Sequence, residues 1–253
     1  MRMVRLSVNV NKVATLRNSR GGMLPSVIEA VEVCIEAGAP GITVHPRADR
    51  RHIKPDDVRA IARALEGRVP TVEFNIEGDP RSELLDLVEE VRPDQCTLVP
   101  VVPGEITSQA GWQPGLASEQ LPAVIRRLKS LGTRVSLFVD AQPDAVRWAS
   151  SIGADRVELY TEPFARAFER GADQAHRSFV HCTEAARVAD SVGLAVNAGH
   201  DLDLANLVMF RNLPFLAEVS IGHAIISRAV FVGLSTVVRE YLDVLRYTEH
   251  NGQ

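Results

Sequence analysis

Residues 41–52 of the chain read GITVHPRADRRH, an apolar run followed at once by basic and imidazole side chains. The run Gly41–Val44 is rich in β-branched residues, which is typical of a short buried strand. Pro46 ends this strand and restricts His45 to an extended backbone. Histidines and arginines therefore crowd the end of one strand, where they suit proton transfer and anion binding. Taken alone, the stretch also fits a structural histidine followed by a solvated basic turn.

Similar apolar runs recur along the chain, separated by amphipathic helical patterns. The predicted strands are Arg5–Val10, Gly41–Val44, Val72–Ile76, Cys96–Val99, Val135–Val139, Arg156–Leu159, Leu194–Asn197 and Glu218–Ile221. The predicted helices are Ser26–Ala37, Pro55–Leu65, Pro80–Val91, Glu119–Leu131, Asp144–Ser151, Asp173–Ser191, Asp203–Phe210 and Ala224–Leu245. Apolar strands that alternate with helices indicate a parallel sheet covered on both faces.

Eight strand–helix units in 253 residues predict an α/β fold, a single (β/α)8 TIM barrel with extra helices that spans residues 1–253. The alternative is a doubly wound open sheet, which lacks support because no G-x-G-x-x-G turn follows a strand. The longest predicted loops, Asn11–Pro25, Pro100–Ser118 and Tyr160–Ala172, all follow strands and so belong to the carboxyl face of the barrel. We expect Trp112 to pack beneath the second loop rather than to contact a ligand.

Composition excludes several classes of partner. The net charge of −4 argues against a general nucleic-acid surface, and no apolar run has membrane length. Three cysteines, Cys34, Cys96 and Cys182, show neither paired nor metal-binding spacing, so we expect buried thiols in a reducing cytoplasm. No H-E-x-x-H motif or other metal-ligand spacing is present, and the sequence predicts no metal site.

Polar residues gather at the predicted carboxyl ends of the strands and hardly occur elsewhere in them. The group comprises Asn9, Asn11, Lys12, Arg20, His45, Arg47, His52, Glu73, Glu158, His200, Asp201 and His223, which follows Gly222. In a barrel such strand ends converge on one mouth. Because a carboxylate within an apolar strand is costly unless paired or functional, we expect Glu73 and Glu158 to point into the barrel or to be paired.

The last predicted strand leads through Gly222-His223 directly into a helix. A helix N-terminus presents free N–H groups and the positive end of the helix dipole. In barrels, phosphate often binds at the loops after strands seven and eight. Gly199 and Gly222 together with this helix start therefore predict a phosphate site, although a close turn onto the helix would leave the same pattern.

Five segments resemble the pyridoxine 5′-phosphate synthase family. They are residues 9–21, 41–47, 50–53, 197–200 and 221–224. The resemblance implies a (β/α)8 barrel with added helices, no metal or organic cofactor, and a homo-octamer. It implies the substrates 1-deoxy-D-xylulose 5-phosphate and 3-amino-2-oxopropyl phosphate, and the products pyridoxine 5′-phosphate, inorganic phosphate and water.

The resemblance also implies residue roles. His45 and Glu73 would accept protons, and His200 would donate one. Glu158 would stabilise positive charge in the transition state. The positions implied to hold the aminoketone phosphate are Asn9, Arg20, Gly222 and His223. Those implied to hold the deoxyxylulose phosphate are Arg47, His52 and Thr107.

Three positions depart from the family pattern, which has Asp-His at Asn11-Lys12 and Gly at Asp201. Asn11 keeps a hydrogen-bond acceptor, and Lys12 adds a firm positive charge that suits a phosphate. The Asp201 carboxylate would repel a phosphate, but its backbone N–H is available and its side chain could cap the next helix. We count all three among the expected substrate-binding residues.

Two other functions fit the sequence. The first is an aldolase-type barrel in which Lys12 forms a Schiff base with a sugar phosphate. The second is a non-catalytic sensor of phosphorylated metabolites that keeps the barrel. Borohydride trapping on Lys12 would support the first, and turnover with both substrates would exclude the second.

Overall fold

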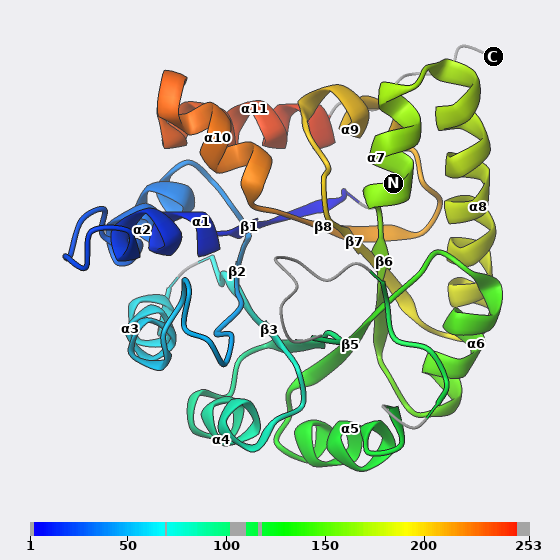
Figure 1. Cartoon of the computed structure of the whole chain (residues 1–253), viewed down its shortest axis with the longest axis horizontal. Coiled ribbons are helices and arrows are strands. Elements are labelled where there is room, and N and C mark those ends of the chain that lie inside the picture. The colour runs from blue at the N-terminus through cyan, green and yellow to red at the C-terminus, as the bar shows by residue number, and fades with distance from the viewer. Residues whose placement is uncertain (1–2, 69, 102–109, 116–117, 247–253) are drawn as a thin grey trace.

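The computed structural model describes residues 3–68, 70–101, 110–115 and 118–246. Eight parallel strands close into a barrel in chain order (Figure 1). They are β1 Arg5–Asn9, β2 Gly41–Val44, β3 Glu73–Gly78, β4 Gln95–Leu98, β5 Arg134–Val139, β6 Arg156–Tyr160, β7 Ala195–Gly199 and β8 Leu216–Ile221. Each predicted strand is present within two residues at either end. The barrel prediction is therefore confirmed, and the doubly wound alternative is excluded.

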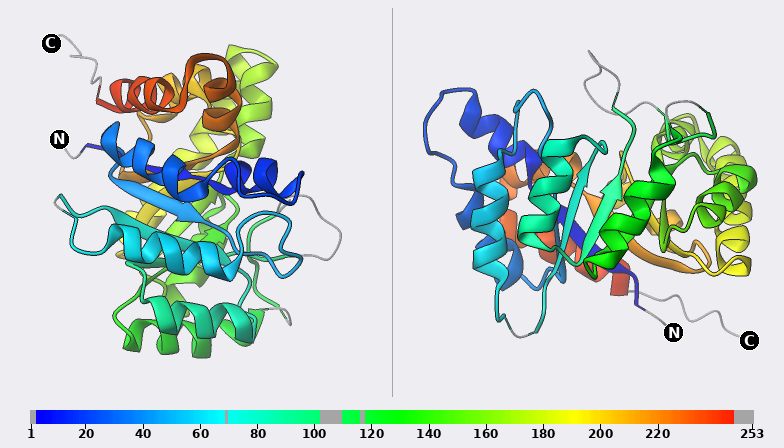
Figure 2. Two further views of the ribbon diagram at one scale, coloured as in Figure 1. Left: turned by 90° about the vertical axis from the view of Figure 1, so that its left-hand side faces the viewer. Right: turned by 90° about the horizontal axis from the view of Figure 1, so that it is seen from below.

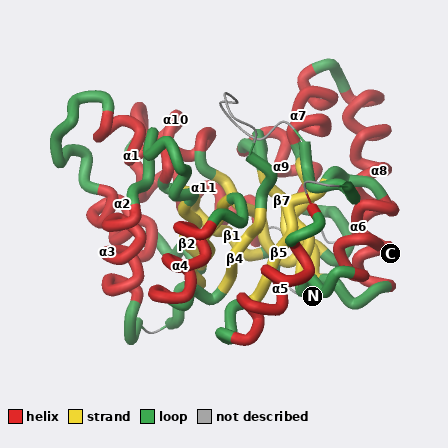
Figure 3. The backbone as a smooth tube through the Cα atoms, turned by 60° about the horizontal axis from the view of Figure 1, so that its bottom comes forward, coloured by secondary structure: helices red, strands yellow, loops and turns green. Residues whose placement is uncertain are grey.

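Helices enclose the strands on the outside, as the views in Figures 2 and 3 show. In the described part of the chain they are α1 Asn11–Asn18, α2 Val27–Glu36, α3 Pro55–Leu65, α4 Ser82–Val91, α5 Leu121–Ser130, α6 Pro143–Ser151, α7 Glu162–Glu169, α8 Ala172–Ser191, α9 Leu204–Phe210, α10 His223–Val232 and α11 Leu234–Arg246. The last predicted helix, 224–245, is in fact two helices. Gly233 separates them with φ +86°, a conformation that glycine adopts without strain.

Helices α1 and α7 correct two predicted loops. Each is only eight residues long, too short to be stable on its own, so tertiary contacts must hold it. In α1, the two terminal guanidinium nitrogens of Arg17 donate to the Asp57 carboxylate of α3 at 2.5 and 2.9 Å. In α7, Phe164 is buried against Phe210 of α9, with ring centroids 5.0 Å apart. Local sequence does not reveal such contacts.

The apolar core lies between the barrel and its helices, whereas the barrel interior is polar. Strand β3 shows the alternation: Glu73, Asn75 and Glu77 bond to inward-facing residues of other strands, with apolar residues between them. Fully buried outward residues include Val8, Ile42, Ile76, Leu98, Leu137, Val157, Val196 and Val219. Polar side chains thus occupy the whole length of the barrel, and the expectation that they hardly occur away from the carboxyl ends is wrong.

Trp112 packs under the loop after β4, as expected. Its side chain is buried, and its indole Nε1–H donates to the carbonyl oxygen of Leu98 at 3.0 Å. Its backbone N–H donates to the carbonyl oxygen of Phe138 at 2.8 Å. These bonds tie the loop to the carboxyl ends of β4 and β5, beside the cavity described below.

Candidate active site

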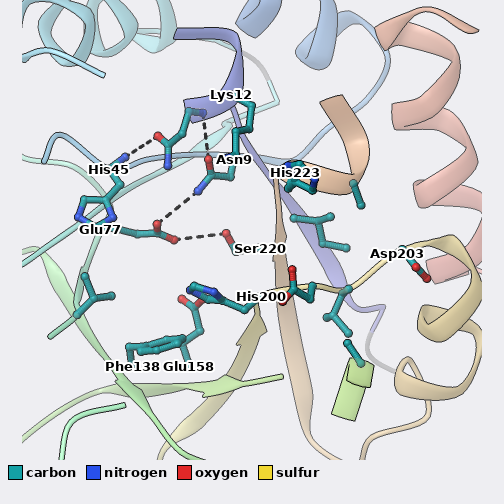
Figure 4. A pocket seen from close by; sticks show the side chains of 18 of the residues that line it. Asn9, Lys12, His45, Glu77, Phe138, Glu158, His200, Asp203, Ser220 and His223 are labelled. Atoms are coloured by element: carbon teal, nitrogen blue, oxygen red, sulfur yellow. Dashed lines mark hydrogen bonds between the residues drawn. The ribbon is translucent and has the colours of Figure 1, made fainter. Parts of the chain in front are cut away.

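A cavity of about 450 Å³ opens at the carboxyl ends of the strands (Figure 4). Eleven of the fourteen predicted site residues line it. They are Asn9, Asn11, Lys12, His45, Arg47, His52, Glu158, His200, Asp201, Gly222 and His223. Of the other three, Glu73 and Arg20 lie outside the lining, and Thr107 falls outside the described residues. The structure therefore brings most of the predicted strand-end residues together.

A chain of hydrogen bonds crosses the side of the cavity formed by β1, β2 and β3. The backbone N–H of His45 donates to Asn11 Oδ1 at 2.9 Å, and the N–H of Asn11 donates to Asn9 Oδ1 at 3.0 Å. Asn9 Nδ2 then donates to Glu77 Oε2 at 3.4 Å. Asn11 thus holds the backbone of His45 through its side-chain oxygen, an acceptor that an aspartate at this position would also provide. Asn11 thereby positions His45 at the cavity.

His45 and His52 form an imidazole pair with ring centroids 5.9 Å apart. Burial lowers the pKa of His45 well below its usual value, and the positive charges of Arg47 and Arg81 lower it further. Burial, with the charge of Arg47, lowers the pKa of His52 to about 4. Both rings are therefore neutral at neutral pH. Among the described residues Nε2 of His45 is buried without a hydrogen-bond partner, so it is free to accept a proton.

His200 lies at the opposite wall, packed between aromatic rings. Its ring centroid is 4.9 Å from that of Phe138 and 5.3 Å from that of Tyr160. Burial lowers the pKa of His200, and the neighbouring Asp201 carboxylate partly opposes this effect. The imidazole is therefore neutral at neutral pH before a ligand binds. To donate a proton, His200 would either give up the single N–H of its neutral ring or first gain a proton beside a bound anion, which would raise the pKa of the imidazole.

Glu158 projects from β6 beside His200 (Figure 4). Its side chain is buried, and burial together with the carboxyl groups of Glu77 and Glu218 raises its pKa well above the usual range. The buried Glu158 carboxyl group therefore favours its neutral form. Stabilisation of positive charge, the role that the family resemblance implies, would require a cationic intermediate to draw off its proton.

Glu77 is an ionisable residue of the cavity lining that the sequence analysis did not include among the site residues. The predicted strand ended at Ile76, whereas β3 continues to Gly78 and places Glu77 in the cavity lining. Burial raises the pKa of Glu77 to about 8. The alternation of polar Glu73, Asn75 and Glu77 with apolar neighbours was the signal that could have revealed it, because alternate residues of a strand share a face.

Glu73 lies at the other end of the barrel. It opens β3 and pairs in register with Gly41, the first residue of β2, whereas His45 follows the last residue of that strand. Three guanidinium groups surround its carboxylate, with closest N···O distances of 2.5 Å to Arg134 and 3.7 Å to Arg5 and to Arg156. The expectation that Glu73 faces the same mouth as His45 is wrong. The second expectation for this residue, that it would be paired, is confirmed.

The start of α10, from which a phosphate site was predicted, lies in the cavity lining. Gly222 is the N-cap residue and carries no side-chain cap, and the cavity lining includes Gly222, His223 and Ala224. The first-turn N–H groups of a helix have no partners within the helix, so they are available to a ligand here. Lys12 and Arg47 add positive charge to the same lining.

Asp201 does not cap the next helix. Asp203 does so, accepting hydrogen bonds from the N–H groups of Ala205 and Asn206 at 2.9 and 2.8 Å. Asp201 instead uses its carbonyl oxygen to accept a bond from Asn206 Nδ2 at 3.0 Å. Its exposed side chain lines the cavity rim.

The described residues contain no group of three or more His, Cys, Asp or Glu side chains placed to hold a metal ion. In the same part of the chain, no helix combines the length and apolar character needed to cross a membrane.

The closed barrel and its cavity of neutral imidazoles, neutral carboxyls and an open helix N-terminus define an acid–base enzyme of the (β/α)8 class. The chain belongs to the family described as pyridoxal phosphate biosynthesis protein PdxJ, whose model matches residues 6–247. Relatives named pyridoxine 5′-phosphate synthase include that of Porphyromonas gingivalis, 47% identical with 96% of this chain and 99% of the relative covered. The Bacteroides thetaiotaomicron relative is 49% identical, with 96% of this chain and 100% of the relative covered.

Solved structures support the fold alone. Phosphoribosylanthranilate isomerase from Thermotoga maritima aligns with a TM-score of 0.59 at 13% identity, covering 96% of this chain and 99% of the other. The Thermus thermophilus isomerase gives a TM-score of 0.59 at 17% identity, covering 96% and 98%.

Proposed function

We propose that the chain condenses 3-amino-2-oxopropyl phosphate with 1-deoxy-D-xylulose 5-phosphate to give pyridoxine 5′-phosphate, inorganic phosphate and water. Family membership and relatives at 47–49% identity over almost the whole chain support this reaction. The structural observation that supports this reaction is that His45, His200 and Glu158 line the same cavity as the N-terminus of α10. The cavity thus combines acid–base groups with a place for a phosphate.

The required chemistry fits these residue types. The amine of the aminoketone can attack the ketone of the sugar itself, so no enzyme lysine is needed for the condensation. The later steps remove protons and expel water and phosphate, which calls for several acids and bases that titrate near neutral pH. We assign proton acceptance to His45, whose buried Nε2 is unpartnered among the described residues. We assign proton donation to His200, and stabilisation of a cationic intermediate to Glu158.

Two phosphate sites are proposed on opposite sides of the cavity. The aminoketone phosphate would bind to the first turn of α10 through Gly222 and His223, beside Asn9. The sugar phosphate would bind to Arg47 and His52. Positive side chains and N–H groups suit phosphate because bonds between a charged group and an anion are about twice as strong as neutral ones.

Of the other residues expected to bind substrate, some line the cavity and others do not. Asn11 and Lys12 line the cavity beside the sugar-phosphate side, and Asp201 lies at the rim. Arg20 is exposed beyond the end of α1 and outside the lining, so its role remains a prediction. Thr107 keeps the role that the family resemblance implies.

We further propose that the chain assembles into a homo-octamer in the cytoplasm. Exposed apolar side chains on two segments favour self-association: Met23 and Leu24 before α2, and Val230, Phe231 and Val232 at the end of α10. Cys34, Cys96 and Cys182 are buried and unpaired, as suits a reducing compartment. Light scattering of the purified protein tests the assembly.

The decisive experiment incubates the pure protein with both substrates and assays pyridoxine 5′-phosphate and phosphate together. Each substrate incubated alone serves as a control and should yield no pyridoxine 5′-phosphate. No product with both substrates present would contradict the proposal. Borohydride reduction of the same mixture tests the aldolase alternative, since a covalent adduct on Lys12 would favour it.

A further inference from the structure

Thr161 lies where two strands of the cavity wall end side by side. β6 ends at Tyr160, which pairs in register with Gly199, the last residue of β7. Thr161 comes next and is the N-cap residue of α7. A threonine at an N-cap usually accepts a hydrogen bond from a first-turn N–H group, yet the Thr161 side chain makes no cap bond. Its hydroxyl group is therefore used for another contact.

The Thr161 hydroxyl group holds the backbone that follows β7. Its Oγ1 donates to the carbonyl oxygens of Gly199 at 2.6 Å and of His200 at 2.5 Å. A hydroxyl group has one proton, so these two carbonyl oxygens share it. The backbone N–H of Thr161 also donates to the Gly199 carbonyl oxygen, at 3.0 Å. Because Thr161 is fully buried, water does not compete for these bonds.

The backbone held in this way has an uncommon conformation. His200 has φ +79° and Asp201 has φ +56°, so two successive residues other than glycine lie in the left-handed region. Such residues persist only where surrounding contacts maintain them. Beyond His200, Nδ2 of the buried Asn206 donates to the carbonyl oxygen of Asp201 at 3.0 Å. Two buried side chains thus hold three successive carbonyl groups, those of residues 199, 200 and 201.

This turn determines where the His200 imidazole lies. The ring lines the cavity beside Phe138 (Figure 4), with its centroid 4.9 Å from that of Phe138 and 5.3 Å from that of Tyr160. Backbone conformation sets the direction of the Cα–Cβ bond. A His200 backbone that returned to an ordinary extended or helical conformation would therefore carry the imidazole away from these two rings.

We propose that Thr161 is a positioning residue for His200: its hydroxyl group fixes the left-handed turn after β7 and thereby holds the imidazole at the substrate. The assignment rests on the proposed function, in which His200 donates a proton. A proton donor must lie within hydrogen-bond distance of the reacting group, or reach it through one water. Without the hydroxyl group the His200 carbonyl loses this bond, and the turn relaxes toward an ordinary backbone conformation.

The test compares Thr161→Val with Thr133→Val, since valine keeps the branched shape of threonine but lacks the hydroxyl group. Thr133 is the matched control because it is also buried and its Oγ1 donates to a remote carbonyl oxygen, that of Pro93, at 3.1 Å. It directly precedes β5, at the amino end of the barrel. We expect kcat to fall roughly 10–100-fold in Thr161→Val and to stay near the wild-type value in Thr133→Val. Thr161→Ser restores the hydroxyl group and should recover most of kcat.

Two measurements distinguish the positioning of His200 from a general structural role. In a His200→Asn background, Thr161→Val should cause little further loss of kcat, because the residue through which it acts is gone. In unliganded protein with labelled histidines, the NMR signals of the His200 ring are displaced by the ring currents of Phe138 and Tyr160. These signals, identified by their absence in His200→Asn, should move in Thr161→Val and stay in place in Thr133→Val.

Three results would each overturn the proposal: unchanged His200 signals in folded Thr161→Val, wild-type kcat in that variant, or an equally large loss of kcat in the His200→Asn background. Thr161→Ser and Thr161→Ala differ only in the hydroxyl group, and they provide the same comparison if the valine variant does not fold. A wild-type protein that does not condense the two substrates would contradict the proposed function. The NMR comparison would then decide by itself whether Thr161 positions His200.

Discussion

Gly199 and Glu158 approach each other so closely that a Cβ atom at position 199 would lie 2.2 Å from Glu158 Oε1. A separation this short is impossible for real atoms, so any larger residue would push the carboxyl group aside. The absence of a side chain on β7 therefore allows the carboxyl of β6 to sit beside His200 at the cavity. Gly199 thus contributes to the site by leaving room for the Glu158 carboxyl group.

Gly199→Ala should displace Glu158 and lower turnover. A shift of about 1 Å in a catalytic group can cost on the order of 10²-fold in rate, and overpacking should also reduce the free energy of unfolding by about 1–3 kcal/mol. Steady-state kinetics and urea unfolding measure the two effects. Gly22→Ala is the matched control, because a Cβ there meets no atom within 4 Å. Full turnover by Gly199→Ala would show that Glu158 does not need its present position.

The pH dependence of stability follows from the buried histidines. Burial lowers the pKa of His52 to about 4 in the folded protein, whereas the unfolded chain has a value near 6.5. Between these values the unfolded state binds more protons, so the free energy of unfolding should fall as pH drops from 6.5 to 4. One proton gives at most about 1.4 kcal/mol per pH unit. His45 and His200, whose pKa values are also lowered, act in the same direction.

Denaturant unfolding of the unliganded protein at several pH values checks this dependence. The slope between pH 6.5 and 4 should be shallower in His52→Asn than in wild type. His176→Asn, at an exposed position on α8, should keep the wild-type slope. Equal slopes in wild type and His52→Asn would show that His52 does not gain a proton on unfolding.

Lys12 should bind substrate without forming a covalent adduct. It lies in the lining at the start of α1, on the same side as Arg47 and His52. Lys12→Ala should weaken the affinity for a phosphorylated substrate by about 1.5–3 kcal/mol, the usual contribution of a charged hydrogen bond. Lys12→Arg keeps the charge and should lose less. Calorimetry measures both variants, and an unchanged affinity in Lys12→Ala would remove Lys12 from the binding site.

The strands were predictable because each is an apolar, β-branched run set off by a helical pattern. The helices α1 and α7 were not, since eight residues carry too little periodicity and contacts such as Arg17 with Asp57 are remote in sequence. Within the site, His45 and His200 were predictable because each directly follows the end of a strand. Glu77 was missed because the predicted strand ended one residue short of it. Only the register, which pairs Gly41 with Glu73 and Ile76 with Val44, shows which carboxylate reaches the mouth.

The same register decides what to expect of Glu73. It pairs with Gly41, four residues before His45, which places it about 13 Å down the barrel at the usual rise of a strand. A proton acceptor must reach the reacting group within hydrogen-bond distance or through one water. The structure instead surrounds Glu73 with three arginines, and leaving them without this carboxylate should destabilise the protein.

Glu73→Gln therefore separates the role that the family resemblance implies from the role that the geometry indicates. We expect the free energy of unfolding to fall by about 3–5 kcal/mol, the usual cost of breaking a buried ion pair, while the folded variant keeps most of its kcat. Unfolding curves and kinetics on the same preparation measure both quantities. If Glu73 is the proton acceptor, kcat should instead drop roughly 10²–10⁴-fold with substrate affinity retained. That result would mean that protons travel along the polar interior of the barrel between Glu73 and the mouth, because direct contact with a substrate bound beside His45 is too distant.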